Sequence, residues 1–374
     1  MISYWEQTAL VEYDLVVIGA GITGIFCALT YRNKYPNARI AILERGLFSE
    51  GASTKNAGFA CFGSLSELLE DRQIMGDEAL LELVHQRREG LALLKNTLNE
   101  KAIGLELNGG YELFFEKNPL ELEKLESINT LLYPLFNTKV FQPINSKINS
   151  FGLDSEKVKH LIENPFEGGL HTGKLMHNLR LKANSLKIEI FSHTWVEEID
   201  TSNTQTQIQL KNQSIKIKTH KLAVCTNGFA AELIPELKIN PGRGIVLITS
   251  PIKKLKIKGT FHYQKGYYYF RSIENRILLG GGRNLDFKNE ETTEFGINPK
   301  IKAQLTADLK QFILPQQPFS IAMEWSGIMG FGTEKTPIIR KINESIAVGV
   351  RLGGMGVAIG SKIGASTAAL LMDS

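Results

Sequence analysis

The segment that decides the fold is Asp14–Gly24, DLVVIGAGITG, in which an apolar run ends at a cluster of glycines. The run Asp14–Ile18 is short, continuous and rich in valine, which is typical of a strand buried on both faces of a parallel sheet. Ile22–Lys34 then carries apolar residues at helical spacing and ends before a proline. A second strand is predicted over Arg39–Leu43. The N-terminal segment therefore predicts a βαβ unit.

The three glycines of this cluster suit a turn that binds a dinucleotide. Gly19 permits the tight turn after the strand, Gly21 lets the backbone approach a pyrophosphate, and Gly24 allows the helix to pack closely on the strand. The first turn of the helix, with Ile22 and Thr23, then presents unpaired N–H groups and the positive end of the helix dipole to that anion.

Glu44 ends the second predicted strand, at the spacing from the glycines where a carboxylate accepts hydrogen bonds from ribose hydroxyls. Its negative charge would repel the 2′-phosphate of NADP. Up to this residue, NAD and FAD remain alternatives.

Composition excludes several classes of protein. With 374 residues the chain is long enough for two domains, and 43% hydrophobic with 22% charged residues is typical of a soluble globular protein. The net charge is only +4, and lysines alternate in Ile215–Lys221 and Lys253–Lys258 as on the outer face of a strand. We therefore expect no nucleic-acid partner.

Three cysteines, Cys27, Cys61 and Cys225, lie far apart, which indicates neither a disulfide framework nor a metal site and favours the cytoplasm. The N-terminus lacks the basic and long apolar regions of a signal peptide. The stretch Leu352–Met372 contains Lys362 and several glycines, so no membrane span is expected.

The middle of the chain carries antiparallel patterns. An Asn108-Gly109 turn within Gly104–Phe115 predicts one hairpin, and a Glu274-Asn275 turn after GYYYFRS predicts another. Helices are expected over Ser66–Lys101 and Leu120–Leu132, a three-stranded meander over Lys187–Cys225, and a strand over Ser345–Val350 that leads through a glycine-rich turn into a closing helix.

The residues after Glu44 distinguish FAD from NAD. ERG (Glu44–Gly46) followed by GASTKNAG (Gly51–Gly58) resembles the FAD-binding region of the D-amino-acid oxidase superfamily, which includes glycine oxidases, sarcosine oxidases and bacterial polyamine oxidoreductases. The similarity continues in order through HTWVEEID (His193–Asp200), LAVCTNG (Leu222–Gly228), PGRG (Pro241–Gly244), YYYFRS (Tyr267–Ser272), WSGIMG (Trp325–Gly330) and VGVRLGGMGVAIG (Val348–Gly360).

The resemblance implies an α/β protein: a Rossmann-type FAD-binding domain with an interleaved α+β substrate domain built on an antiparallel or mixed sheet. We assign residues 1–65, 155–235 and 326–374 to the FAD-binding domain, and residues 66–154 and 236–325 to the substrate domain. Sarcosine oxidases tether FAD through a cysteine in the stretch that corresponds to Trp325–Pro337, where this chain has none. FAD is therefore expected to bind non-covalently.

Beyond the glycine cluster and Glu44, the resemblance implies further FAD contacts, at Arg45, Ser53, Thr54, Lys55, Asn56, Gly58, Val196, Thr226, Gly228, Arg351, Gly353, Gly354, Met355 and Gly356. Val196 would meet the adenine through its backbone. The glycine-rich turn before the last helix would place a positive dipole end at the flavin, where negative charge develops on reduction. Ordinary helix capping by Ser53 or Thr54, a plain turn at Thr226 and an exposed position for Arg351 are the alternatives.

Substrate residues are expected from the second hairpin. Strand alternation puts Tyr267, Tyr269 and Arg271 on one face, where an arginine among phenols can clamp a carboxylate. Packing of Arg271 on the aromatic rings is the alternative. Amino-acid oxidases of the family often carry a second arginine where this chain has Met329, so a two-arginine clamp is not expected.

The sequence thus predicts an FAD-dependent oxidoreductase that removes hydride from the α carbon of a small amine or amino acid, with oxygen or another electron acceptor reoxidising the flavin and water hydrolysing the imine. One alternative is dehydrogenation of a 2-hydroxy acid, which needs a base such as His171 or His262. His171 is expected to be structural, beside a helix capped by Thr172. The other alternative is a flavin-binding module or RNA-modifying flavoprotein without free small-molecule turnover.

Overall fold

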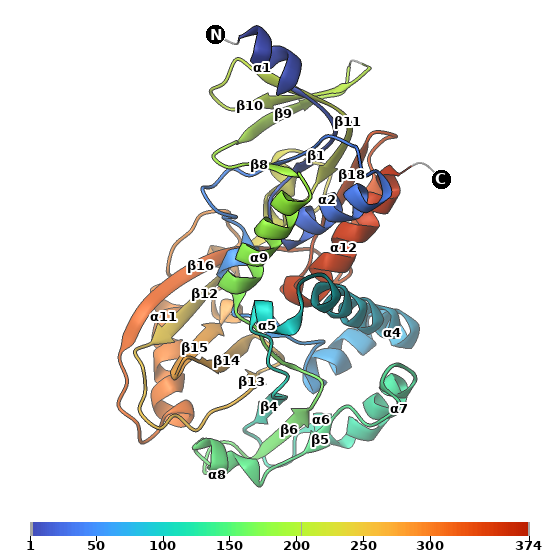
Figure 1. The fold of residues 1–374 in the computed structure, drawn as a ribbon. Helices are drawn as coiled ribbons and strands as arrows, with labels where there is room; N and C mark the ends of the chain where they lie inside the picture. Colours follow the sequence, from blue (N-terminus) through green and yellow to red (C-terminus); the bar gives the residue numbers. More distant parts are fainter. Residues whose placement is uncertain (1–2, 203, 373–374) are drawn as a thin grey trace.

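Two large β-sheets form the framework of the protein, as a computed structural model that describes residues 3–202 and 204–372 shows (Figure 1). The first sheet has eight strands, in the order β17-β18-β11-β1-β2-β8 with β9 and β10 attached to β11. Their bounds are β1 Glu12–Ile18, β2 Ile40–Leu43, β8 Glu189–Phe191, β9 Val196–Asp200, β10 Thr206–Leu210, β11 Lys216–Val224, β17 Ile338–Lys341 and β18 Ile346–Val350.

The centre of this sheet is parallel, as the N-terminal pattern predicts. β1 pairs in parallel with β2 on one side and β11 on the other, and β11 pairs in parallel with β18. Alternation along β1 sends Leu15 and Val17 into one hydrophobic cluster and Val16 and Ile18 into another on the opposite face. Because both faces are covered, the strand is apolar throughout.

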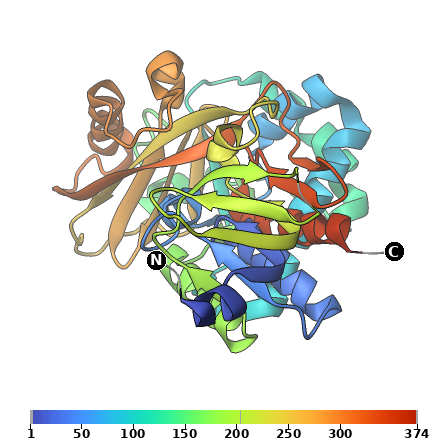
Figure 2. The same cartoon turned by 90° about the horizontal axis from the view of Figure 1, so that it is seen from above.

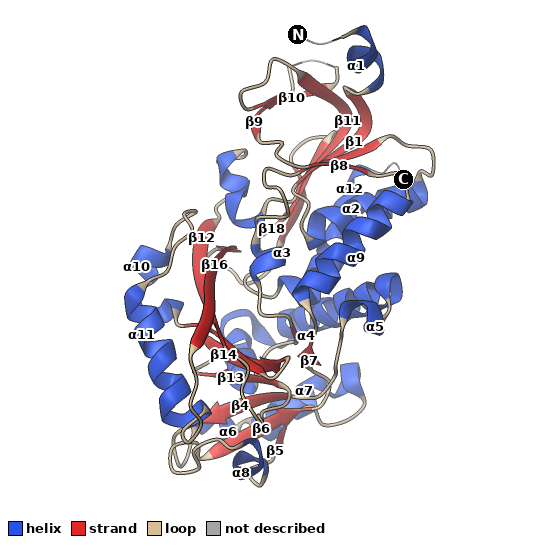
Figure 3. Ribbon diagram, turned by 60° about the vertical axis from the view of Figure 1, so that its left-hand side comes forward, coloured by secondary structure: helices blue, strands red, loops and turns tan. Residues whose placement is uncertain are grey.

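Three helices cover one face of the first sheet (Figure 3): α2 (Ile22–Lys34), α9 (Thr172–Ser185) and α12 (Gly356–Leu371). β9 and β10 continue antiparallel from β11, and their side chains Val196 and Ile208 join the cluster of Val16 and Ile18 on the other face. The predicted βαβ unit and closing helix are thus confirmed, and so is a three-stranded meander of β9, β10 and β11. The predicted stretch Lys187–Cys225 also contains β8, which pairs in parallel with β2 instead.

The second sheet also has eight strands, in the order β16-β12-β15-β14-β13-β4-β6-β5. It is mixed, because β13 and β4 pair in parallel while the other neighbours are antiparallel. The strands are β4 Gly110–Phe114, β5 Gln142–Pro143, β6 His160–Asn164, β12 Asn240–Thr249, β13 Thr260–Tyr263, β14 Tyr268–Ile273, β15 Arg276–Gly281 and β16 Ile321–Phe331. A predicted α/β fold with a second, mixed sheet is confirmed.

The remaining helices surround this sheet and the join between the two sheets. From above, β16 and α11 lie at one side of the molecule and α4 at the other (Figure 2). Their bounds are α1 Tyr4–Ala9, α3 Ala52–Lys55, α4 Leu65–Leu98, α5 Glu100–Ile103, α6 Leu120–Glu123, α7 Leu125–Phe136, α8 Lys147–Phe151, α10 Phe287–Glu290 and α11 Pro299–Asp308. Short segments are β3 Phe59–Ala60, β7 Gly168–Gly169, η1 Asn227–Glu232, η2 Arg283–Leu285 and η3 Leu309–Ile313.

The hairpin predicted at Glu274-Asn275 is confirmed. Both residues have positive φ, 48° and 58°, as a type I′ turn requires, and they join β14 to β15. The hairpin predicted at Asn108-Gly109 is wrong. β4 pairs with β6 and β13 instead, and Glu106 forms an isolated bridge to Gly169. The two segments that flank the turn therefore pair with other parts of the chain and not with each other.

Two other expectations differ from the structure. Lys253–Lys258 lies in a loop before β13 and not on a strand, whereas β11 does alternate exposed and buried residues over Lys216–Thr219. β6 belongs to the second sheet although the expected FAD-binding domain includes residues 155–235, and β16 crosses the expected boundary at residue 326. No helix within the described ranges is long and apolar enough to cross a membrane.

Candidate functional site

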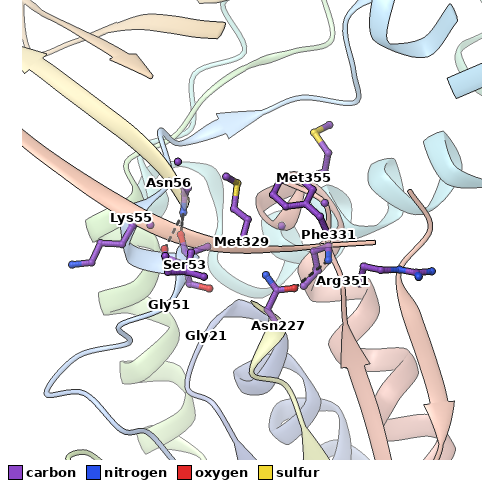
Figure 4. Close-up of a pocket in the computed structure, with 18 of the residues that line it drawn as sticks. Gly21, Gly51, Ser53, Lys55, Asn56, Asn227, Met329, Phe331, Arg351 and Met355 are labelled. Carbon is purple, nitrogen blue, oxygen red and sulfur yellow. Dashed lines mark hydrogen bonds between the residues drawn. The ribbon is translucent and has the colours of Figure 1, made fainter. Parts of the chain in front are cut away.

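A cavity of about 610 Å³ lies between the two sheets. The carboxyl ends of β1 and β2, the N-termini of α2 and α12, and the inner face of β12–β15 all contribute to its wall. In Figure 4, Met329 lies between the loop that carries Ser53 and Asn56 and the segment that carries Met355. The chain therefore brings the predicted dinucleotide turn, the predicted flavin segment and the predicted substrate strands to one site.

The glycine turn at one end of the cavity has the geometry that its sequence predicts. Gly19 has φ +102°, and a β-carbon at Gly24 would come within 1.9 Å of the Gly19 carbonyl oxygen. Gly21 begins α2 without a side chain to cap it, and the Ile22 amide donates to Ser53 Oγ at 3.0 Å. Gly21, Ile22 and Thr23 line the cavity, so the start of α2 faces it.

Glu44 is 6% exposed and stands at the end of β2, on the cavity wall. Its Oε2 accepts from the Ala20 amide at 3.0 Å, and its Oε1 accepts from the amides of Gly46 and Glu50 at 3.1 and 3.3 Å. The carboxylate thus connects the glycine turn to the following loop. These bonds fix its position, and its role toward a ribose stays a prediction.

The loop Gly51–Gly58 divides into residues that line the cavity and residues that hold the loop. Ser53, Lys55 and Asn56 line the cavity. Thr54 does not, because its hydroxyl donates to the carbonyl of Ser49. Gly58 does not either: it has φ +73°, and a β-carbon there would lie 2.3 Å from the Leu170 oxygen. The close contact that favours glycine at position 58 is therefore with the Leu170 carbonyl oxygen, within the protein itself.

An aromatic and cationic group lies beside Val196 at the nucleotide end. Val196 and Arg45 line the cavity together with Trp195 and Phe229. The Arg45 guanidinium carbon is 3.7 Å from the Phe229 ring centroid and 5.4 Å from that of Trp195. Trp195, which is 43% exposed, offers a flat apolar surface that sequence reasoning did not single out.

The turn before α12 also faces the cavity. Gly353 and Gly354 have φ +57° and +86°, which favour glycine, and Met355 begins the helix without a side-chain cap. Gly353, Gly354, Met355 and Gly356 all line the cavity. A second helix N-terminus, with its unpaired N–H groups, therefore points to the same space as that of α2.

Neighbours of this turn are fixed by polar contacts. Asn227 Oδ1 accepts from the Leu352 amide at 3.2 Å. Thr226 lines the cavity, and its buried hydroxyl has no partner within the described chain. Gly228 does not line the cavity, because it packs against the Met329 carbonyl of β16. Arg351 lines the cavity, but its guanidinium pairs with Glu334 at 3.0 Å.

The inner face of the second sheet forms the other end of the cavity. Tyr267 and Tyr269 line it, as predicted. Phe59 packs edge-on against Tyr269, with ring centroids 5.5 Å apart. Gly280, opposite Tyr269 on β15, leaves room for that ring, because a β-carbon there would lie 2.6 Å from it. Tyr268 lies in the core on the far face of the sheet.

Arg271 does not line the cavity, contrary to the expected carboxylate clamp. It shares the inner face of β14 but is only 7% exposed. Its Nη1 donates to the carbonyls of Gly58 and Leu170 at 2.7 and 2.8 Å. Burial lowers the pKa of Arg271 to about 10. The residue therefore joins three segments of backbone.

Arg283, and not Arg271, is the arginine that lies on the cavity wall beside Tyr267. It follows β15 and lies against two rings, with its guanidinium carbon 3.9 Å from the Phe331 centroid and 4.9 Å from that of Phe287. The nearby carboxylates are Glu291 and Glu290, and Glu290 pairs with Arg243 at 2.9 Å. No ion pair to Arg283 is found among the described residues. Its only signal in the sequence is a lone arginine after GGG.

His262, one of the two histidines named from the sequence as a possible base, lies at the cavity. It lies on β13, is 7% exposed, and lines the cavity. Neither ring nitrogen has a hydrogen-bond partner within the described chain. His171, in contrast, does not line the cavity; it is itself the N-cap of α9, and its Nδ1 accepts from the Lys174 amide at 3.2 Å. Thr172 is the first residue of that helix, not its cap.

An ion-paired cluster lies on the wall where α4 meets the second sheet. Glu70 of α4 pairs with Lys265, in the β13–β14 turn, and with Lys335, in the loop after β16, both at 3.3 Å. Asp71 also pairs with Lys335. The cluster ties three separate segments together. No group of three His, Cys, Asp or Glu residues that could hold a metal occurs among residues 3–202 and 204–372.

Two fully buried carboxyl groups lie near this wall. Burial raises the pKa of Glu112 to about 7 and that of Glu167 to about 8. Glu112 accepts from the Ser66 amide at 3.0 Å, and Glu167 accepts from the Phe62 amide at 2.7 Å. These bonds connect the first turn of α4 to β4 of the second sheet, and Phe62 to the loop between β6 and β7.

Comparison with known families agrees with this architecture. The profile of the DAO family, described as FAD dependent oxidoreductase, matches residues 14–370. No curated protein matches the sequence. Among solved structures, L-proline dehydrogenase from P. horikoshii is similar at 18% identity and a TM-score of 0.78, covering 96% of this chain and 93% of the other.

Two further solved structures share the fold. Glycine oxidase from Geobacillus kaustophilus is 19% identical with a TM-score of 0.73, covering 96% of this chain and 95% of its own. L-amino acid deaminase from Proteus vulgaris, without its specific insertion, is 16% identical with a TM-score of 0.74, covering 96% and 90%.

Proposed function

Because this chain belongs to the DAO family of FAD-dependent oxidoreductases, we propose that it oxidises a small amino acid at the α carbon. Residues suited to hold FAD are present at the cavity. Two helix N-termini without side-chain caps, those of α2 and α12, face the same space. The first suits a pyrophosphate, and the second suits negative charge on the flavin ring.

FAD, when bound, supplies the acceptor for a hydride, which carries both electrons of the oxidation. The protein's own task is then to hold the substrate and exclude water. Tyr267, Tyr269, Phe59 and Phe331 provide a largely aromatic wall beside Arg283. Such a wall suits a small organic molecule with one anionic group.

Arg283 is the observation that carries the proposal. Its guanidinium lies on the wall between two rings and has no carboxylate partner in the described chain. Arg283 is half-buried, and burial lowers its pKa, so a bound carboxylate would offset the cost of holding this charge partly away from water. Arg283 thus takes the role that the sequence suggested for Arg271.

The reaction balances without a protein nucleophile. The neutral amino acid loses hydride from its α carbon and a proton from its nitrogen, which leaves a C=N double bond. Water then adds to the imine and releases a 2-oxo acid and ammonia, or a smaller amine from a secondary amino acid. Positioning supplies much of the rate increase in such a reaction.

Dehydrogenation of a 2-hydroxy acid is the second candidate, and His262 on the cavity wall is the observation that favours it. That reaction needs a base for the hydroxyl proton. Burial lowers the pKa of His262 to about 4, which makes the imidazole a weak base. An amino acid that binds with a neutral nitrogen needs no such base, so the amine substrate is favoured.

A paired substrate screen tests the proposal. The FAD-loaded protein is incubated in air with glycine and both enantiomers of alanine, each beside the 2-hydroxy acid of the same skeleton (glycolate or lactate), and also with sarcosine and proline. Flavin absorbance, peroxide and 2-oxo acid are measured together. We expect turnover by at least one amino acid and none by its hydroxy counterpart. Turnover by the hydroxy acids alone would contradict the amine reaction.

A further inference from the structure

His262 lies in a row of side chains that crosses the inner face of the second sheet. In register with it are Tyr269 of β14 on one side and Glu112 of β4 on the other. Its sequence neighbours Phe261 and Tyr263 point to the opposite face and belong to the hydrophobic core. Strand alternation therefore fixes the imidazole toward the cavity.

The surroundings of the imidazole offer it no hydrogen bond. Phe59 of β3 packs edge-on against it, with ring centroids 5.0 Å apart. Glu112, the titratable neighbour from β4, is engaged with the amide and hydroxyl of Ser66. Tyr269, from β14, also makes no bond to either ring nitrogen. The ring is thus buried at the cavity wall with two unpaired polar atoms.

A buried imidazole without hydrogen bonds destabilises the folded protein unless a ligand supplies the missing hydrogen bonds. Burying a polar group without a hydrogen bond destabilises a protein, because the group loses its bonds to water and gains none in return. The same burial lowers the pKa of His262 to about 4, so the ring is neutral at physiological pH. A neutral imidazole has one nitrogen that accepts and one that donates.

We propose that His262 positions the substrate by accepting a hydrogen bond from the N–H of its amino group. The proposal rests on the proposed function and deepens it, because it assigns the second polar group of the substrate. Arg283 offers a fixed positive charge for the carboxylate, so the neutral acceptor is left for the nitrogen. A neutral acceptor suits an amine that must bind uncharged, since an ammonium nitrogen has no lone pair to stabilise the developing imine.

The competing explanation is that His262 serves only to pack against its neighbours. The thermal stability of a variant distinguishes this role from hydrogen bonding to the substrate. Replacing a packing histidine by a residue that cannot restore its contacts lowers the melting temperature. Replacing an unpaired one by phenylalanine removes the cost of two buried nitrogens. We therefore expect the FAD-loaded His262→Phe protein to melt at or above the wild-type temperature. A clear decrease, or loss of FAD from this variant, would overturn the proposal.

Two planar acids test the hydrogen bond itself. Pyrrole-2-carboxylate and furan-2-carboxylate have the same shape and carboxylate, but only the first has an N–H. Their dissociation constants are measured from the changes in flavin absorbance for the wild type, His262→Phe and His262→Gln. We expect the wild type to favour the pyrrole acid by about three- to tenfold, as one neutral hydrogen bond implies.

His262→Phe should bind the two acids equally, and His262→Gln, whose amide oxygen accepts, should retain part of the preference. Equal binding by the wild type, or a preference that persists in His262→Phe, would overturn the proposal. Arg283→Leu is the control for the carboxylate, because it should weaken both acids alike. If neither acid binds the wild type, the carboxylate part of the proposed function fails, and the melting comparison, which needs no ligand, decides the role of His262.

Discussion

The carbonyl oxygen of Gly19 lies so close to Gly24 that a β-carbon on Gly24 would come within 1.9 Å of it. This contact joins the end of β1 to the first turn of α2, and it determines how closely the helix N-terminus approaches the cavity. The third glycine of the turn is therefore required for packing, as the sequence pattern predicts.

Gly24→Ala should displace α2 from the turn and weaken FAD binding at least tenfold, because the added methyl group would meet a backbone oxygen and not the end of a flexible side chain. Gly173→Ala is the matched control: it lies exposed in the first turn of α9, and a β-carbon there would meet a side chain, the ring of His171, at 3.1 Å. The control should keep the FAD affinity of the wild type. Flavin absorbance per protein and thermal melting measure both effects.

Substitutions of Glu44 should separate hydrogen bonding from charge. Glu44→Gln keeps one acceptor oxygen for the three amides that bond to the carboxylate, so we expect a folded protein with reduced FAD affinity. Glu44→Arg places a cation against backbone donors and should yield a colourless protein. Flavin content after purification measures this, and a fully loaded Glu44→Arg protein would contradict the assigned nucleotide end.

Arg271 and Arg283 should respond in opposite ways to replacement. Arg271→Leu leaves the carbonyls of Gly58 and Leu170 without their donor, so the free energy of unfolding should fall by about 3 kcal/mol. Arg283→Leu should barely change stability but raise KM for an amino acid about tenfold or more. Chemical denaturation and steady-state kinetics separate the two, and an unchanged KM in Arg283→Leu would rule out the clamp.

The stability of the protein should decline as pH rises toward 8. Glu167 has a pKa of about 8 in the folded protein against 4.5 in its ordinary state, so between these values the folded chain holds one more proton than the unfolded chain. Its contribution to stability is complete below pH 4.5 and is lost as pH rises through 8. The free energy of unfolding falls by about 1.4 kcal/mol per pH unit in this range.

Denaturant melts from pH 5.5 to 8 measure that slope. Glu167→Gln should make the dependence of the unfolding free energy on pH less steep over the whole range. Glu112→Gln should do so only up to about pH 7, where Glu112 ionises. Equal slopes in the wild type and both variants would show that neither carboxyl group is protonated in the folded protein.

Local patterns in the sequence were sufficient for the dinucleotide unit and for the turn at Glu274-Asn275. In both, the residues that decide the geometry are neighbours along the chain. The hairpin predicted at Asn108-Gly109 is wrong because the partners of β4 are β6 and β13, which are far away in sequence.

The role of Arg271 could not be read from its strand. Alternation correctly put it on the inner face, but its acceptors lie 213 and 101 residues away in sequence, at Gly58 and Leu170. His262 required knowledge of strand order, since its unpaired state depends on which residues β4 and β14 place beside it. Family resemblance indicated FAD, and the three-dimensional arrangement added Arg283 and the unpaired ring nitrogens of His262.

Reduction of the bound FAD under anaerobic conditions tests the central claim most directly. The FAD-loaded protein is mixed with the amino acid that performs best in the screen, either protiated or deuterated at the α carbon, and flavin absorbance is followed in a single turnover. We predict complete bleaching, slowed severalfold by deuterium, because the α C–H bond breaks as the flavin is reduced. Absorbance that stays unchanged with every amino acid, while a 2-hydroxy acid bleaches the flavin, would contradict the account.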